Sequence, residues 1–422
     1  MSDSSVLGMD SARPSATTSF PRRPRLAAPS PGTPWVALIT MSATVFVVVS
    51  AEMMPTAVLP MLAADLGVGL PAGGLLVSAW AATVVVASFP LTRLMAGRDR
   101  PMVIAGALVV VALATLVTAS APTYAVAMGS RLVAAAATGL LWATVNVHAV
   151  SIVREQSMAR ATAVVLFGGT LGTVFSLPAG NALAELAGWR APFVVLAVAA
   201  LIVAVAVRVA LRTAPVLDEG GRTSLGAGGR RPLWPVVAIG ALGGLVLAAH
   251  FMPFTFVAEL LAPSPLPAAL LLVVFGGVGV AGVGVVGAVG DRSPGLLAVL
   301  MATMMVLSLA ALPVLGSSAP IDLLIMVLWG TVVGAVGPSV QSYLMRTAGV
   351  EHRRTAGAMM PVAMNLGIAL GAAAGSLTVE RWDLGRVPVM AVVPAALAAV
   401  GFWVVGRVLH AHREVSAKAS TQ

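Results

Sequence analysis

The sequence predicts an all-α integral membrane protein: twelve transmembrane helices in two pseudo-symmetric six-helix bundles. Three observations carry this prediction. First, 59% of the 422 residues are hydrophobic and only 10% are charged, against about 25% charged in a soluble domain. Second, twelve apolar runs each approach or exceed the roughly 20 residues that cross a bilayer core. Third, a motif in the first run recurs in the seventh. Most of the chain is therefore expected to lie in lipid.

The twelve apolar runs follow one another with short breaks, apart from one long polar break in the middle. Gly and Pro are frequent inside the runs, which helices in lipid tolerate. The runs are 35–60, 73–95, 101–120, 124–150, 160–184, 190–211, 233–260, 266–290, 295–316, 319–345, 355–379 and 387–409.

The polar segments divide the chain. Residues 1–33 are rich in Ser, Pro and Arg and are predicted to be a disordered cytoplasmic tail. An N-terminal six-helix bundle is expected over 34–211 and a C-terminal one over 233–409. Residues 212–232 would form the cytoplasmic linker between them, and residues 410–422 a second cytoplasmic tail.

The basic residues predict the orientation. They cluster between alternate runs, in segments that all face the same side if both termini are cytoplasmic. The protein is thus expected to be a multi-pass protein of the cytoplasmic membrane. The net charge of +9 is spread over these loops and not gathered on one amphipathic element. This distribution argues against a nucleic-acid partner and favours an anionic lipid leaflet.

Several kinds of chemistry find no support in the sequence. Cysteine is absent, which excludes disulfides and thiol catalysis. No dinucleotide-binding, phosphate-loop or zinc-protease motif is present. The sequence therefore predicts no enzyme, no catalytic residue, no metal site and no cofactor.

The internal repeat lies near the predicted outer ends of the first and seventh runs. Ala51–Pro55 reads AEMMP and Ala249–Pro253 reads AHFMP, so Glu52 and His250 are equivalent positions. Both side chains can change protonation, and each is followed three residues later by a helix-bending proline, Pro55 or Pro253. A carboxylate in a lipid-spanning run is expensive to bury and is therefore a candidate functional group.

Glu52 and Arg131 are expected to lie at similar depth in the N-terminal bundle. Glu52 is about 25 Å along the first helix, and Arg131 is about 10 Å into the fourth helix, which runs the opposite way. We expect Glu52 to be the proton and cation-substrate site, with Arg131 tuning it or holding the fourth helix. A purely structural hydrogen-bonding role remains open for each residue, and His250 is either an interior histidine or a second coupling group.

Further residues are candidates for the lining of a substrate cavity. Methionine and aromatic side chains suit varied lipophilic ligands, and amides in lipid-spanning runs could orient a substrate or bond a neighbouring helix. Ordinary packing explains each of them equally well. The candidates are Met53, Met54, Trp142, Asn146, Phe251, Phe254, Gln341 and Asn365.

The chain resembles the major facilitator superfamily over about residues 35–410. The segment from Glu52 through Pro60 to Val68 is similar to E-F-x-P-x-x-L-L-P-x-I-A-x-D-L-G-V, which is typical of the twelve-helix drug:proton antiporters near the arabinose and sugar efflux permeases and chloramphenicol-type exporters. Arg131 with Gly139 and Trp142 resembles the fourth-helix motif of that family. The resemblance implies the major facilitator fold.

Two further motifs of the family are partly present. Gly172, Pro178 and Gly180 resemble a reduced antiporter motif in the fifth helix, in which Leu177 replaces a glycine. Charged loops lie between helices 2 and 3 and between helices 8 and 9. The resemblance implies that their charges latch the outward-facing state and act in gating: Arg98, Asp99, Arg100, Asp291 and Arg292.

The first hypothesis for function is a monomeric, proton-coupled secondary exporter of a lipophilic or cationic small molecule, such as a drug or natural product. It would alternate access by rocking two bundles about a central cavity. An efflux permease for sugars or polar metabolites is the alternative, although intramembrane amides are few. An importer, or a membrane sensor that does not transport, remains a further possibility.

Overall fold

The computed structural model describes residues 34–153, 158–211, 232–289, 293–349 and 352–419 of the chain. These residues belong to one compact unit that begins at Pro34 and contains helices and no strand within the described ranges. The helices are α1 Trp35–Asp65, α2 Leu70–Leu94, α3 Arg100–Ala119, α4 Tyr124–Ser151, α5 Met158–Ala187, α6 Arg190–Ala210, α7 Trp234–Phe254, α8 Val257–Leu260, α9 Ala268–Val289, α10 Pro294–Ala311, the 3₁₀ turn η2 Leu312–Val314, α11 Ala319–Ala348, α12 Arg353–Arg381 and α13 Arg386–Ala419.

The predicted all-α membrane fold is confirmed. Apart from the short α8 and η2, the described part of the chain has twelve long helices, one for each predicted run. Eleven of the described helices are long and apolar enough to cross a bilayer, and α9 contributes a shorter apolar stretch, Ala268–Gly284. The last helix continues to Ala419, beyond the predicted end of its run at 409.

The seventh predicted run is divided in the structure. Residues 233–260 were expected to form one helix, but α7 ends at Phe254 and the short α8 begins at Val257. Pro253 has no backbone N–H to continue the helix ladder. The hydroxyl of Thr255 donates a hydrogen bond to the Phe251 carbonyl at 2.6 Å, and the Phe256 N–H bonds the Pro253 carbonyl in a tighter turn that ends the α-helix.

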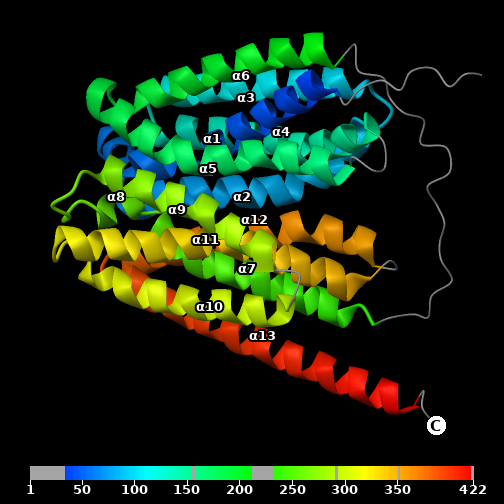
Figure 1. The fold of residues 1–422 in the computed structure, drawn as a ribbon. Coiled ribbons are helices and arrows are strands. Elements are labelled where there is room, and N and C mark those ends of the chain that lie inside the picture. The colour runs from blue at the N-terminus through cyan, green and yellow to red at the C-terminus, as the bar shows by residue number, and fades with distance from the viewer. Residues whose placement is uncertain (1–33, 154–157, 212–231, 290–292, 350–351, 420–422) are drawn as a thin grey trace, which may run out of the picture. The chain divides into compact units, whose positions relative to one another are not determined.

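The helices form two bundles of six with matching internal packing. In the first, α1 packs on α5, α2 on α4 and α3 on α6; in the second, α7 packs on α12, α9 on α11 and α10 on α13. If the six long helices of each bundle are counted in chain order, both bundles pair the first with the fifth, the second with the fourth and the third with the sixth. Figure 1 shows the first bundle in blue to green and the second in green to red. The repeat predicted from the sequence is therefore visible as a repeat of packing.

The two bundles contact each other through three helix pairs: α2 with α12, α5 with α9 and α1 with α8. We name the two ends of the bundles by residues: the Asp65 end, where α1 ends and α2 begins, and the Arg100 end, where α2 ends and α3 begins. The short α8 lies at the Asp65 end, beyond α7 (Figure 1).

Two glycines allow close approach between the bundles. A Cβ on Gly74 of α2 would overlap Ser376 of α12 and come within 2.8 Å of the Phe256 ring. A Cβ on Gly276 of α9 would lie 2.9 Å from the backbone carbonyl oxygen of Val174 in α5. Pro178, four residues after Val174, leaves that carbonyl without its usual intrahelical partner.

Burial along α2 shows where the contact is made. Its buried residues all lie in the part that begins at the Asp65 end, between Gly73 and Val84. Toward the Arg100 end, Val86 and Phe89 are 74% and 65% exposed. The bundles are thus packed together at the Asp65 end, and α2 leaves that contact toward the Arg100 end.

Candidate functional site

Glu52 lies in α1 among the packed helices and does not face the lipid. Its side chain is only 6% exposed, and its Oε1 atom is buried with no hydrogen-bond partner among the described residues. A buried carboxylate oxygen without a partner carries a large desolvation cost. Such a group is suited to binding a proton, which removes the charge and hence most of this cost.

Pro55 prepares the backbone beside Glu52 to accept a hydrogen bond from another helix. In an α-helix the N–H of residue 55 would donate to the carbonyl of Ala51, but proline has no N–H. Arg131 of α4 supplies the missing donor: its NH1 group lies 3.2 Å from the Ala51 oxygen and its NH2 group 3.4 Å from the Glu52 oxygen. Arg131 is itself 2% exposed.

Trp80 of α2 completes a three-helix cluster. The Arg131 guanidinium carbon lies 4.4 Å from the centre of the Trp80 ring, within range of a cation–π interaction. The opposite charges of Glu52 and Arg131 also attract each other. The Arg131 Nε and Trp80 Nε1 atoms are buried and unpaired among the described residues. We call Glu52, Trp80 and Arg131 the Glu52 cluster.

His250 lies at the equivalent place in the second bundle, inside an aromatic cluster. Its ring centre is 4.9 Å from that of Phe251, 4.5 Å from Phe254, 6.3 Å from Phe275 and 5.4 Å from Trp329. The His250 Nδ1 and Trp329 Nε1 atoms are buried and unpaired among the described residues. We call these five residues the His250 cluster.

The two clusters are built to one plan. Glu52 and His250 are 198 positions apart, and so are Arg131 and Trp329. Each cluster also takes a ring from the helix that pairs with α4 or α11: Trp80 from α2 and Phe275 from α9. One bundle thus carries an acid and a base beside an indole, and the other carries an imidazole among aromatic rings.

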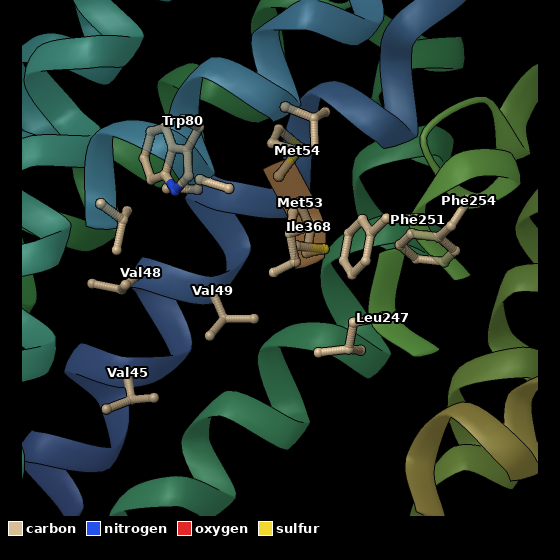
Figure 2. Packing of buried hydrophobic residues seen from close by; sticks show 14 of the residues in the cluster. Val45, Val48, Val49, Met53, Met54, Trp80, Leu247, Phe251, Phe254 and Ile368 are labelled. Atoms are coloured by element: carbon tan, nitrogen blue, oxygen red, sulfur yellow. The ribbon is translucent and has the colours of Figure 1, made fainter. Parts of the chain in front are cut away.

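Apolar side chains lie between the two clusters. In Figure 2, Met53 of α1 points across to Ile368 of α12 and Phe251 of α7, and Leu247 lies nearby. All four belong to one buried apolar cluster that includes residues of both bundles. Met54, by contrast, packs inside the first bundle, close to Gly180 of α5.

The glycines of the fifth-helix motif serve close packing inside the first bundle. A Cβ on Gly172 would lie 2.9 Å from the Phe46 carbonyl oxygen of α1, and one on Gly180 would lie 2.7 Å from the Met54 sulfur. Pro178 of the same motif is buried between them. Together they bring α5 against α1 near Glu52.

The predicted amides Asn146 and Asn365 make their hydrogen bonds within their own helices. Asn146 donates to the Trp142 carbonyl and Asn365 to the Pro361 carbonyl, each four residues back in its own helix. Trp142 lines a small pocket between α1 and α4, with Thr44, Val45, Val48, Leu141 and Val145. Gln341 of α11 is half-buried.

The predicted gating charges are only partly described. Asp99 caps α3 by accepting from the Met102 N–H at 3.1 Å, and it pairs with Arg208 of α6 at 3.6 Å. Both contacts lie within the first bundle. Arg98 is exposed, and Arg100 begins α3. Asp291 and Arg292 lie outside the described residues, so their predicted gating role stays a prediction.

Sequence reasoning did not single out Trp80, Phe275 or Trp329. The spacing of 198 positions that relates Glu52 to His250 would have found Trp329 when applied to Arg131. No comparable signal points to Trp80 or Phe275, because each is one apolar residue in a long apolar run.

Comparisons with known proteins agree with this architecture. The sequence profile of the Major Facilitator Superfamily matches residues 41–372. The chain belongs to the major facilitator superfamily. The predicted family is therefore confirmed, and with it the fold of two six-helix bundles.

Several major facilitator proteins are similar to this chain. A chloramphenicol efflux pump of Mycobacterium tuberculosis (strain CDC 1551 / Oshkosh) is 30% identical over 388 residues, which cover 87% of this chain and 89% of the pump. The inner membrane transport protein YdhP of Escherichia coli (strain K12) is 30% identical over 374 residues, 86% of this chain and 93% of YdhP.

Two solved structures share the fold at low sequence identity. A bacterial homologue of the human lysosomal transporter Spinster, in an inward-facing and unoccupied conformation, has a TM-score of 0.68 and 15% identity, covering 90% of this chain and 98% of the homologue. The nucleoside transporter NupG has a TM-score of 0.68 and 13% identity, covering 88% and 99%. This chain is thus a multi-pass membrane transporter of the major facilitator type, a family that handles small molecules.

Proposed function

We propose that this protein is a proton-coupled exporter of lipophilic small molecules, with drugs of the chloramphenicol type as the first candidates. The observation that carries the proposal is the Glu52 cluster: a buried carboxyl group, held beside a buried guanidinium, in the bundle of a major facilitator protein. The efflux pump of Mycobacterium tuberculosis, at 30% identity over most of both chains, supports the substrate class.

Glu52 is the proton-binding group in this proposal. The Glu52 carboxyl group is buried among apolar helices beside the Arg131 guanidinium. Opening of the bundles would admit water or substrate and change these surroundings. The proton then binds to a Glu52 oxygen when one side is open and leaves when the other side is open, which couples its movement to the cargo.

The His250 cluster is the proposed contact for the cargo. It offers aromatic faces, and it offers the N–H of Trp329 and the Nδ1 of His250 as hydrogen-bonding atoms without partners among the described residues. Phe251 of this cluster lies where the two bundles meet, near Met53 of the first bundle (Figure 2). Chloramphenicol, a neutral nitroaromatic compound, matches such a surface in kind. The few amides near either cluster make sugars a poorer match.

The proposed orientation places both termini in the cytoplasm, as the arginine-rich loops at the Arg100 end suggest. The Asp65 end would then face outward. Packing of the bundles at that end corresponds to an inward-facing transporter ready to take up a compound from the cytoplasm and the inner leaflet. The monomer would complete the cycle by closing the Arg100 end and opening the Asp65 end.

The test uses the purified full chain in liposomes with an imposed pH gradient and labelled chloramphenicol. Wild-type protein should move the compound against the proton flow, and Glu52→Gln should reduce gradient-driven transport by about tenfold or more, because a proton-transfer group has been removed. A labelled pentose serves as the competing substrate. Transport of chloramphenicol that ignores the gradient, or transport of the pentose alone, would overturn the proposal.

A further inference from the structure

Pro55 lies inside α1, where a proline bends the helix and also frees a backbone carbonyl. The Ala51 carbonyl loses its intrahelical donor because residue 55 has no N–H. A buried carbonyl without any donor is destabilising. The Arg131 NH1 group, 3.2 Å away on α4, satisfies it. The proline therefore creates the acceptor on which Arg131 is held.

Trp80 of α2 is a further contact of the same guanidinium. Its ring centre lies 4.4 Å from the guanidinium carbon, and the side chain is 1% exposed. The two backbone carbonyls and the indole face together define where the Arg131 charge lies. None of these three partners is a carboxylate.

We infer that Pro55 and Trp80 are positioning residues for Arg131: they hold its guanidinium on the α1 backbone and limit its pairing with the Glu52 carboxylate. The inference deepens the proposed proton coupling and rests on it for its transport readout. Neither residue touches the proton. Both decide how strongly Arg131 favours the ionised form of Glu52.

The second bundle supports this assignment. Pro253 is equivalent to Pro55, but the position equivalent to Arg131 holds Trp329, which has no charge to place. There the helix ends after Phe254. In the first bundle α1 continues through Pro55 and Pro60 to Asp65. The arginine thus stabilises the freed backbone in the bundle that carries the acid.

The first experiment compares Pro55→Ala with Pro60→Ala, a matched control in the same helix. Pro60 also frees a carbonyl, that of Thr56. The Arg131 hydrogen bonds, however, go to the carbonyls of Ala51 and Glu52. In proteoliposomes, Pro55→Ala should move the curve of chloramphenicol transport against pH to lower pH by about one unit, because the released guanidinium pairs with the carboxylate. Pro60→Ala should leave the curve in place.

The second experiment addresses Trp80 through a conservative pair of variants. Trp80→Phe retains an aromatic face and should keep the wild-type pH curve, whereas Trp80→Leu should move it in the same direction as Pro55→Ala. A shift of equal size in Pro55→Ala and Pro60→Ala, or no shift in Pro55→Ala and Trp80→Leu, would overturn the inference while leaving proton coupling intact.

Thermal unfolding in detergent tests the positioning without any transport. Arg131→Met should lower the melting temperature in the wild-type and Pro60→Ala backgrounds. The drop should be smaller in the Pro55→Ala background, where the Ala51 carbonyl regains a donor from its own helix. Equal drops in all three backgrounds would refute the inference, even if transport proved independent of the proton gradient.

Discussion

Glu52 and His250 hold the same place in the two halves of the chain, yet their surroundings make them chemically different. Glu52 lies beside Arg131, and its Oε1 atom has no hydrogen-bond partner in the described part of the chain. His250 lies among four aromatic rings, and Trp329 stands where Arg131 stands in the first bundle. The sequence alone kept both residues as coupling candidates. These contacts support the proposal that Glu52 is the coupling group and that His250 contacts the ligand.

A prediction separates these two roles. His250→Phe keeps an aromatic ring of similar shape and removes the titratable nitrogen. We expect the variant to keep the pH dependence of wild-type transport and to lose affinity for chloramphenicol by roughly tenfold, as expected for one or two hydrogen bonds. Transport measured at a series of pH values and substrate concentrations checks both. Loss of pH dependence in His250→Phe would make His250 a coupling group.

Much of the residue-level site could be predicted from the sequence. A glutamate in an apolar run identified Glu52, and counting along two antiparallel helices placed Arg131 at its depth, where the structure has them in contact. The cation–π face of Trp80 could not be predicted. An apolar run in lipid has no polar face, so its periodicity does not show which side meets another helix.

At the scale of helices, one repeated proline motif gives two outcomes. The α1 helix passes through Pro55, whereas α7 stops one residue after Pro253. In α1, Arg131 of α4 donates to the carbonyl that Pro55 frees, whereas the position equivalent to Arg131 in the second bundle holds Trp329. Because the donor in the first bundle belongs to another helix, local sequence could not predict the division of the seventh run.

Gly276 lies at the contact between α9 and α5. Its Cα faces the Val174 backbone, where Pro178 has left a free carbonyl. Gly276→Val would push α5 and α9 apart and should cost the packed form about 1–3 kcal/mol. We expect a lower melting temperature and a larger share of molecules open at the Asp65 end. Gly277→Val is the matched control, because a Cβ there meets nothing within 4 Å.

The natural chain contains no cysteine. The reactivity of a single cysteine introduced near the interface therefore measures the fraction of molecules that are open at the Asp65 end. Gly276→Val should increase labelling of such a cysteine by a small water-soluble reagent, and Gly277→Val should not. Equal labelling in the two variants would show that the α5–α9 contact does not hold the bundles together at this end.

From Pro34 onward, the described residues form two similarly packed bundles that meet at the Asp65 end. The two-bundle fold was predictable, because twelve apolar runs and one repeated motif leave few alternatives. Which end is packed was not predictable. In the proposed transport cycle both ends pack in turn, so the sequence would encode a packing surface at each end, and the structure shows the one at the Asp65 end.

A cross-link tests whether this packing must open. Gly74 of α2 and Ser376 of α12 are in close contact across the interface, so Gly74→Cys with Ser376→Cys should form a disulfide under mild oxidation. The oxidised protein should bind chloramphenicol but lose nearly all transport, and reduction should restore it. Undiminished transport by the fully oxidised protein would mean that the Asp65 end is not a gate. Each single cysteine variant is the control.

In the drug exporter proposed above, the shared plan of the two clusters decides where new resistance can arise. In the first bundle, acid, guanidinium and indole depend on one another, so few replacements at Glu52, Trp80 or Arg131 would leave a working pump. In the second, rings pack against rings, and one aromatic side chain can stand in for another. Cells that carry the proposed exporter and meet an unfamiliar antibiotic should therefore accumulate gain-of-function alleles around Phe254, Phe275 and Trp329, while the proposed proton-coupling residues stay unchanged.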